Sequence, residues 1–301
     1  MQIESIDVLS GLRDALTAPP ASRESLLDTR VVQPLRVFWE RFAAMRPQTT
    51  PLSERGPSEI AGGIGLYHTG LDPTAGLAAL DELASADALA QCLRGLEDAA
   101  AQLAPERHGV DLDAVRFALA LADPAHLEPR TDMYTGVGMI PGALLVTVWP
   151  TPFNVPRLPA IAVHELNHNV RFRAEPWHPV TTTVGKYLVD EGVAECFAAE
   201  RYGEAMLGRW TTGLTTAEID ALKPRYRDAI DVTGFGEIRG WSFGDWSAER
   251  FGHAKVGVPD FAGYAVGYRL VRAFLERSGT SAAEATYLPW REIVDGSGFF
   301  R

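Results

Sequence analysis

The chain has 301 residues, 46% of them hydrophobic, which is enough to bury a sizeable core as one large domain or as a catalytic domain with a helical extension. Its 39 acidic residues outnumber the 28 basic ones, and the net charge of −11 argues against non-specific binding to nucleic acids or to anionic membrane surfaces. The cysteines, Cys92 and Cys196, are too few and too far apart for a disulfide framework, and the acidic N-terminus does not resemble a signal peptide. No apolar stretch is long enough to cross a bilayer, so we expect a cytoplasmic protein.

The first third of the chain predicts helices joined by polar connections. Apolar residues recur at helical spacing, and prolines and glycines mark the breaks. The predicted elements are a short amphipathic helix within 1–18, a longer helix over 22–45 with a kink or boundary at Pro34, a loop over 47–65, and one or two helices over 75–103 that break near 85–87. We therefore expect residues 1–109 to form a helical N-terminal region that packs on a catalytic domain of residues 110–301.

Two apolar runs in the middle of the chain predict strands, over residues 115–121 and 143–149. The glycine-rich residues 136–142 lead into the second run. Glycines there would let a peptide backbone come close, and an unpaired sheet edge would accept a peptide as an extra strand. A glycine-rich hairpin without a ligand explains the same residues equally well. The predicted fold class is α+β, mostly helical with a small sheet beside the helix that follows.

A metal-binding motif comes next, in His164-Glu165-Leu166-Asn167-His168. In a helix, His164 and His168 lie one turn apart on the same face, so both imidazoles reach one metal ion. Glu165 lies about 100° around that helix, where it would face the open coordination position and take a proton from a bound water. Three protein ligands plus water are typical of a catalytic zinc site, whereas a structural site is closed by four protein ligands.

Residues 190–195, Asp-Glu-Gly-Val-Ala-Glu, supply the remaining carboxylates. Glu191 is the expected third ligand, and Glu195, one turn later, is expected to accept a hydrogen bond from a ligating histidine and fix its orientation. The two glutamates share a helix face and could exchange these roles. His178, in the connection between the two helices, is an alternative third ligand, and Cys196 is expected to be buried and inert.

Together, the two motifs resemble the gluzincin metallopeptidases, whose third zinc ligand is a glutamate on a second helix. More narrowly, the chain is similar over residues 110–300 to a bacterial family of predicted zinc-dependent proteases of unknown function. The other matching features are Thr135-Gly136-Val137-Gly138, the strand before the histidine helix, and Gly263-Tyr264-Ala265-Val266-Gly267-Tyr268. The resemblance implies a zincin-like fold, Zn²⁺ and peptide-bond hydrolysis, and it places substrate on an edge strand near Val137 to Ala143. It does not identify the substrate.

The C-terminal part predicts helices around a segment rich in glycine and aromatic residues. The expected elements are a helix over 215–231, a flap or an irregular aromatic cluster over 234–259, a helix over 260–277, and a last helix from Ser281 to 296. Gly263 and Gly267 would let another helix approach closely. By the same resemblance, a tyrosine or histidine stabilises the oxyanion of the reaction, and the candidates in order are Tyr264, Tyr268 and His253. Both tyrosines could instead serve only in packing.

These features predict a zinc-dependent peptidase that acts on a peptide or protein. His164, His168 and Glu191 are the predicted zinc ligands, and Glu165 is the predicted general base. One alternative is a zinc amidohydrolase that acts on a small amide, because the same metal chemistry serves either bond. The other is a non-catalytic chaperone-like or regulatory protein that has kept the metalloprotease fold.

Overall fold

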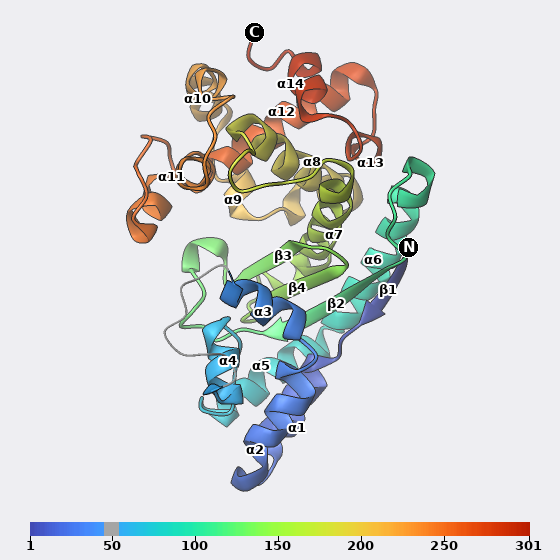
Figure 1. Ribbon diagram of the computed structural model, residues 1–301, viewed down its shortest axis with the longest axis vertical. Helices are drawn as coiled ribbons and strands as arrows, with labels where there is room; N and C mark the ends of the chain where they lie inside the picture. Colours follow the sequence, from blue (N-terminus) through green and yellow to red (C-terminus); the bar gives the residue numbers. More distant parts are fainter. Residues whose placement is uncertain (45–53) are drawn as a thin grey trace. The chain divides into compact units, whose positions relative to one another are not determined.

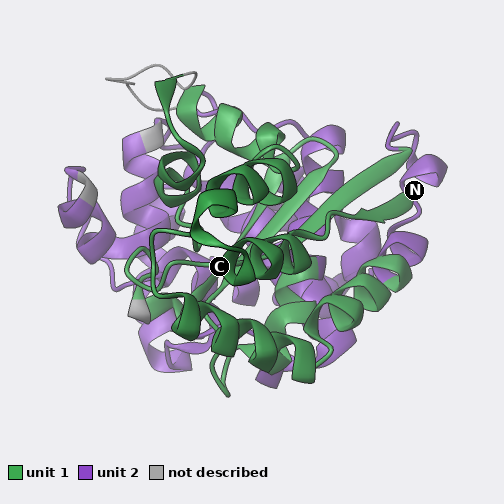
Figure 2. Cartoon of the chain, turned by 90° about the horizontal axis from the view of Figure 1, so that it is seen from below, with its two compact units in different colours: residues 1–98, 113–162 green, residues 99–112, 163–301 purple. Residues whose placement is uncertain are grey.

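Figure 1 shows the computed structural model of the chain, which describes residues 1–44 and 54–301. The chain forms two compact units, each made of two sequence segments (Figure 2). Unit 1 contains residues 1–98 and 113–162, and unit 2 contains residues 99–112 and 163–301. These units are defined by contacts and do not show which parts of the chain fold independently. The domains predicted over residues 1–109 and 110–301 therefore stay a prediction.

Unit 1 contains a four-stranded mixed sheet with the strand order β1-β2-β4-β3. Its strands are β1 (Gln2–Ser5), β2 (Ala114–Leu121), β3 (Tyr134–Ile140) and β4 (Ala143–Val148). β1, β2 and β4 run parallel, and β3 pairs antiparallel with β4 through a short glycine turn. The two predicted strands are confirmed as β2 and β4. Both strands are central, so β4 and residues 117–121 of β2 are buried on both faces. β3 is an edge strand, and its predicted contact with substrate stays a prediction.

Helices surround this sheet within unit 1. They are α1 (Val8–Thr17), α2 (Pro20–Leu27), a π-helical turn (Asp28–Val32), α3 (Arg36–Ala44), α4 (Pro57–Gly63), α5 (Pro73–Ser85) and the first part of α6 (Ala88–Leu103). Asp7 and Asp72 cap α1 and α5 through their side chains. The predicted break before α6 is confirmed, since Asp87 takes a left-handed φ of 51° there. The helix predicted within 1–18 is confirmed as α1, although β1 precedes it within that range. The predicted loop 47–65 is wrong in part, because α4 lies within it, and residues 47–53 lie outside the described part.

Helices are the main elements of unit 2, and no strand longer than an isolated bridge occurs among its described residues. Its helices are most of α7 (Leu158–Ala174), then α8 (Val184–Tyr202), α9 (Arg209–Thr212), α10 (Thr216–Asp228), α11 (Phe235–Phe251), α12 (Ala262–Ser278), α13 (Ala282–Ala285) and α14 (Trp290–Ser297). α8 lies at the centre and packs against α11, α12, α13 and α14. A capping box begins α10, in which Thr215 and Glu218 are the partners.

Glycines let the backbones of unit 2 touch, as the sequence predicted. A Cβ atom at Gly267 of α12 would collide with the carbonyl oxygen of Leu188 in α8. A Cβ atom at Gly263 would lie 2.6 Å from the Cα atom of Ser242 in α11. The segment predicted as a flap or irregular cluster is instead the helix α11, which is kinked at Gly244, where φ is 83°. The turn of α12 that carries Tyr264 is therefore fixed by two backbone contacts.

The fold class is α+β, as predicted: mostly helical, with one small sheet. In the part of the chain that the structure describes, no helix is both long enough and apolar enough to cross a bilayer.

Candidate metal centre

The histidine motif lies on α7, in the part of that helix that belongs to unit 2. Val163, Leu166 and Val170 are fully buried on its apolar sides, so the polar side chains of the motif are held in the interior. His164 and His168 are only 7% and 5% exposed. Two imidazoles buried one turn apart need polar partners, and a shared metal ion would supply one to both.

The third residue comes from α8, which begins at Thr183. The Thr183 side chain accepts a hydrogen bond from the Lys186 amide and caps the helix. Glu191 lies two turns further on and is 7% exposed. Together with His164 and His168 it forms the one group of potential metal ligands found among the described residues.

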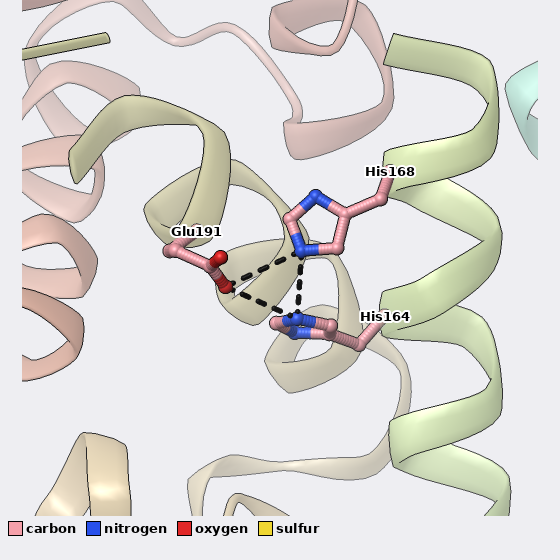
Figure 3. Close-up of side chains that lie close together, drawn as sticks. All are labelled: His164, His168 and Glu191. Atoms are coloured by element: carbon pink, nitrogen blue, oxygen red, sulfur yellow. Dashed lines mark hydrogen bonds and ion pairs between the residues drawn. The ribbon is translucent and has the colours of Figure 1, made fainter. Parts of the chain in front are cut away.

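Figure 3 shows that the three side chains point toward one another across the gap between α7 and α8. The Nε2 atoms of the two histidines are 3.0 Å apart. The Oε2 atom of Glu191 lies 3.4 Å from Nε2 of His164 and 3.3 Å from Nε2 of His168. Tetrahedral zinc with bonds of about 2.0–2.1 Å separates its ligands by about 3.3 Å. The triangle therefore has the size of one face of a zinc tetrahedron, and its two-nitrogen, one-oxygen donor set suits that ion.

Charge in this triangle is balanced by the histidines and the carboxylates. Burial alone would lower the pKa of His164, but Glu195 and Glu191 outweigh burial and raise this pKa to about 9. Burial would likewise raise the pKa of Glu191, but the two histidines hold it well below its usual range. The site thus favours a positive charge between the side chains, which either an imidazole proton or a metal cation supplies.

Glu165 follows His164 on α7 and is also buried, at 7% exposure. Burial raises the pKa of its carboxyl, whereas His164 and His168 lower it, and the net change is upward. A carboxylate with a raised pKa is a stronger proton acceptor, and it lies within electrostatic reach of all three ligands.

Glu195 lies behind His164. Its Oε1 atom is 3.5 Å from Nδ1 of His164 and accepts a hydrogen bond of 2.7 Å from the indole nitrogen of Trp210. Sequence reasoning missed Trp210, because this residue lies on α9 and no local pattern links it to α8. The Nδ1 atom of His168 is buried and has no hydrogen-bond partner in the described part of the chain. Among the described residues, a carboxylate thus lies at the Nδ1 atom of His164 but not at that of His168.

Tyr264 lies near the ligands, together with a second tyrosine that sequence reasoning missed. Tyr187 and Tyr264 lie close enough to each other and to Glu191 for each to shift the pKa of the other. Burial, followed by the charge of Glu191, raises the pKa of both phenols well above the usual value, so both remain hydrogen-bond donors. The signal for Tyr187 was its position one turn before Glu191 on the same helix face.

The other candidates have different partners. The hydroxyl of Tyr268 donates to Glu204 at 2.6 Å and lines a cavity of 400 Å³ with Cys196 and Glu200. Nδ1 of His178 accepts a hydrogen bond from the Val180 amide. The ring of His253 lies against Gly236. Tyr264 is therefore within electrostatic reach of Glu191 and Glu165, whereas the Tyr268 hydroxyl is bound to Glu204, and Cys196 is buried as expected.

The chain is similar to curated proteins of Bacillus subtilis. Over 195 residues, 65% of this chain and 65% of the relative, the chain is 38% identical to "Uncharacterized protein YjfC" of Bacillus subtilis (strain 168). Over 141 residues, 45% of this chain and 49% of the relative, it is 28% identical to "Uncharacterized protein YjaZ" of the same organism. The matches thus span less than two thirds of either relative. No solved structure matches the chain significantly.

The family described as "Predicted Zn-dependent protease (DUF2268)" matches residues 96–295. This region includes every residue of the metal centre described above, and it is the family that the sequence motifs predicted. Since the match extends over more than half of its residues, the chain belongs to the family of predicted Zn-dependent proteases.

Proposed function

We propose that the protein is a zinc-dependent peptidase. The observation that carries this proposal is the buried triangle of His164, His168 and Glu191, whose edges of 3.0–3.4 Å match one face of a zinc tetrahedron. The name of the family supports both the metal and the reaction. Three protein ligands leave a fourth position for water, which is typical of catalytic rather than structural zinc.

His164, His168 and Glu191 would hold the zinc ion. When bound there, zinc would lower the pKa of a water molecule and polarise the carbonyl group of a substrate. Glu165 accepts the proton of the attacking water and later delivers a proton to the leaving amine. Its raised pKa suits both steps, since it lies closer to neutral pH than that of an exposed glutamate.

Two further groups support the reaction. Glu195, held by Trp210, orients the imidazole of His164, so that its other nitrogen faces the ligand triangle. Tyr264 and Tyr187 are protonated donors beside Glu191, and Tyr264 is our candidate for the donor that stabilises the oxyanion. Charge that develops in the transition state would then meet preorganised dipoles rather than water.

The proposed substrate is a peptide or protein. Nucleic acids and anionic membranes are poor partners for a chain with a net charge of −11. A reducing cytoplasm remains the compartment that we propose, because both cysteines are buried as free thiols.

Measurement of the metal content and peptide cleavage of wild type, Glu165→Gln and His168→Ala tests the proposal. We expect one zinc per chain in wild type and in Glu165→Gln, and none in His168→Ala. Cleavage of a quenched peptide library should be lost in both variants, by at least about 100-fold for Glu165→Gln.

Wild-type cleavage by Glu165→Gln would refute the role of Glu165 as the base. Zinc without any peptide cleavage in wild type would refute the peptidase and favour a small-amide hydrolase or a non-catalytic protein. Absence of metal from the wild type would refute the metal centre itself.

A further inference from the structure

A buried ionic cluster lies beside the metal centre, and the proposed mechanism does not use it. In this cluster, Arg171 lies near the C-terminal end of α7, and Glu175 directly follows that helix. Lys186 and Asp190 belong to α8. Arg171 has no exposed surface, Asp190 is 1% exposed and Lys186 is 6% exposed. Buried charges are costly unless each is paired and hydrogen-bonded, so this cluster is a demanding feature of the fold.

Each donor of the cluster is satisfied. Nε of Arg171 donates to Oδ1 of Asp190 at 2.7 Å, and Nη2 donates to Oε2 of Glu175 at 2.8 Å. Nζ of Lys186 donates to the two carboxylate oxygens of Asp190 at 3.0 and 2.9 Å. Two positive and two negative side chains thus neutralise one another, and only Glu175 among them is partly exposed to solvent, at 24%.

The cluster also binds the segment that follows α13. Nη1 of Arg171 donates to the carbonyl oxygens of Ala285, Thr286 and Leu288 at 3.3, 3.0 and 3.1 Å. One turn earlier on α7, Asn167 donates to the hydroxyl of Thr286 at 2.7 Å. Residues 285–288 are therefore tied to the same helix that carries the two histidines.

The position of the cluster along α7 relates it to the metal. His164, His168, Arg171 and Glu175 are spaced by four, three and four residues, which places them along one face of the helix. The first two contact Glu191 of α8, and the last two contact Asp190 and Lys186 of α8. The face of α7 toward α8 thus has two polar layers, the metal ligands and, next to them, the ionic cluster.

We propose that Arg171 and Asp190 are positioning residues that hold the turn of Glu191 against the two histidines. Asp190 directly precedes Glu191, and Arg171 lies one turn after His168, so their 2.7 Å hydrogen bond fixes the separation of α7 and α8 at the metal centre. Ligand distances must be correct within a few tenths of an ångström for tight metal binding. This inference rests on the proposed zinc site, but not on the reaction or its substrate.

The test measures zinc affinity rather than activity. Dissociation constants for zinc are determined by competition with a chromophoric chelator for wild type, Asp190→Asn and Arg171→Lys, and the visible spectrum of bound Co²⁺ reports ligand geometry. We expect each variant to bind zinc at least about 10-fold more weakly than wild type, with an altered Co²⁺ spectrum, as for other residues that orient metal ligands.

The matched control is Tyr287→Phe. Its hydroxyl donates to the carbonyl oxygen of Leu103 at 2.7 Å, so the variant removes a hydrogen bond of the same C-terminal segment without touching the cluster. We expect a lower melting temperature and the wild-type zinc affinity. Should neither single variant fold, Arg171→Met combined with Asp190→Leu removes both charges at once and is measured by the same criteria.

Zinc affinity equal to wild type in the folded cluster variants would overturn the positioning role and leave the zinc site intact. An equal loss of affinity in Tyr287→Phe would also overturn it, because general destabilisation would then explain the effect. Failure of the wild type to bind zinc would overturn both this inference and the proposed function.

Discussion

Replacement of Gly263 by alanine tests the packing that places Tyr264 beside the metal ligands. The new Cβ atom would lie 2.6 Å from the Cα atom of Ser242 and 2.9 Å from the carbonyl oxygen of Trp241. Carbon atoms pack best at about 3.5–4.0 Å, so α11 and α12 would have to separate by about 1 Å. The carbonyl of Trp241 cannot move freely, because it accepts a hydrogen bond of 2.6 Å from the buried Tyr226.

The expected cost follows from these contacts. Overpacking of a core costs about 1–3 kcal/mol, and a strained hydrogen bond adds about 1 kcal/mol. The gain in helix propensity from glycine to alanine returns about 0.5–1 kcal/mol, which leaves a net loss of about 1–3.5 kcal/mol. Since each kcal/mol lowers the melting temperature of a protein of this size by about 2–4 °C, the melting temperature of Gly263→Ala should be roughly 2–14 °C lower.

The control for this substitution is Gly63→Ala in α4. Gly63 is exposed, and no atom lies within 4 Å of the position that its Cβ would occupy. Alanine there should raise stability by up to about 1 kcal/mol, because it only restricts the unfolded chain. Circular dichroism melting curves of both variants, recorded without metal, compare the two sites. An unchanged melting temperature for Gly263→Ala would refute the close approach of α11 and α12.

Three further predictions concern the metal centre. Trp210→Phe removes the indole donor to Glu195 and should weaken zinc binding by roughly 10-fold in a calorimetric titration, whereas unchanged affinity would refute its orienting role. The pKa of His164 is raised from 6.5 to about 9 in the metal-free protein, so this group contributes stability that is fully present below pH 6.5 and is lost as the pH rises through 9. Zinc must displace the same proton, so zinc affinity should rise with pH between 6.5 and 9. A zinc affinity that does not change with pH over this range would contradict the assignment. Tyr264→Phe should lower kcat by about 10-fold or more and leave zinc affinity unchanged. Tyr268→Phe should lower kcat less, because the Tyr268 hydroxyl is bound to Glu204.

The candidate ligands could be predicted from the sequence because helical periodicity places them on the facing sides of two helices that follow each other in the chain. His164 and His168 share a face by their spacing, and the second acidic motif lies close enough along the chain for its helix to pack against the first. What remained open was which glutamate binds. The structure places Glu191 in the triangle and Glu195 behind His164, a distinction that depends on the rotation of α8 about its axis.

The missed features depend on contacts between distant parts of the chain. β1 is only four residues long and is a strand because Ile3 pairs with Val115 of β2, a register that no local pattern reveals. Trp210 reaches Glu195 from a helix of four residues, which has no periodicity to detect. α11 was mistaken for irregular structure because its glycines suggested a flexible segment, whereas Gly244 makes one kink between two helical parts.

The ionic cluster of Arg171, Glu175, Lys186 and Asp190 could be predicted only in part from the sequence. Its members on α7 continue the stripe of the two histidines, so periodicity places Arg171 and Glu175 on the face that carries the metal ligands. An arginine and a glutamate near the end of a helix nevertheless suggest a solvated surface, because these residues are rarely buried. The acidic motif of α8 changes that expectation. If Glu191 faces α7, then Asp190 is buried in the same contact and requires a cation, which the stripe of α7 supplies in Arg171. Metal ligands and ion pair are thus two consequences of one helix contact, and a change that rotates α8 to improve one of them disturbs the other.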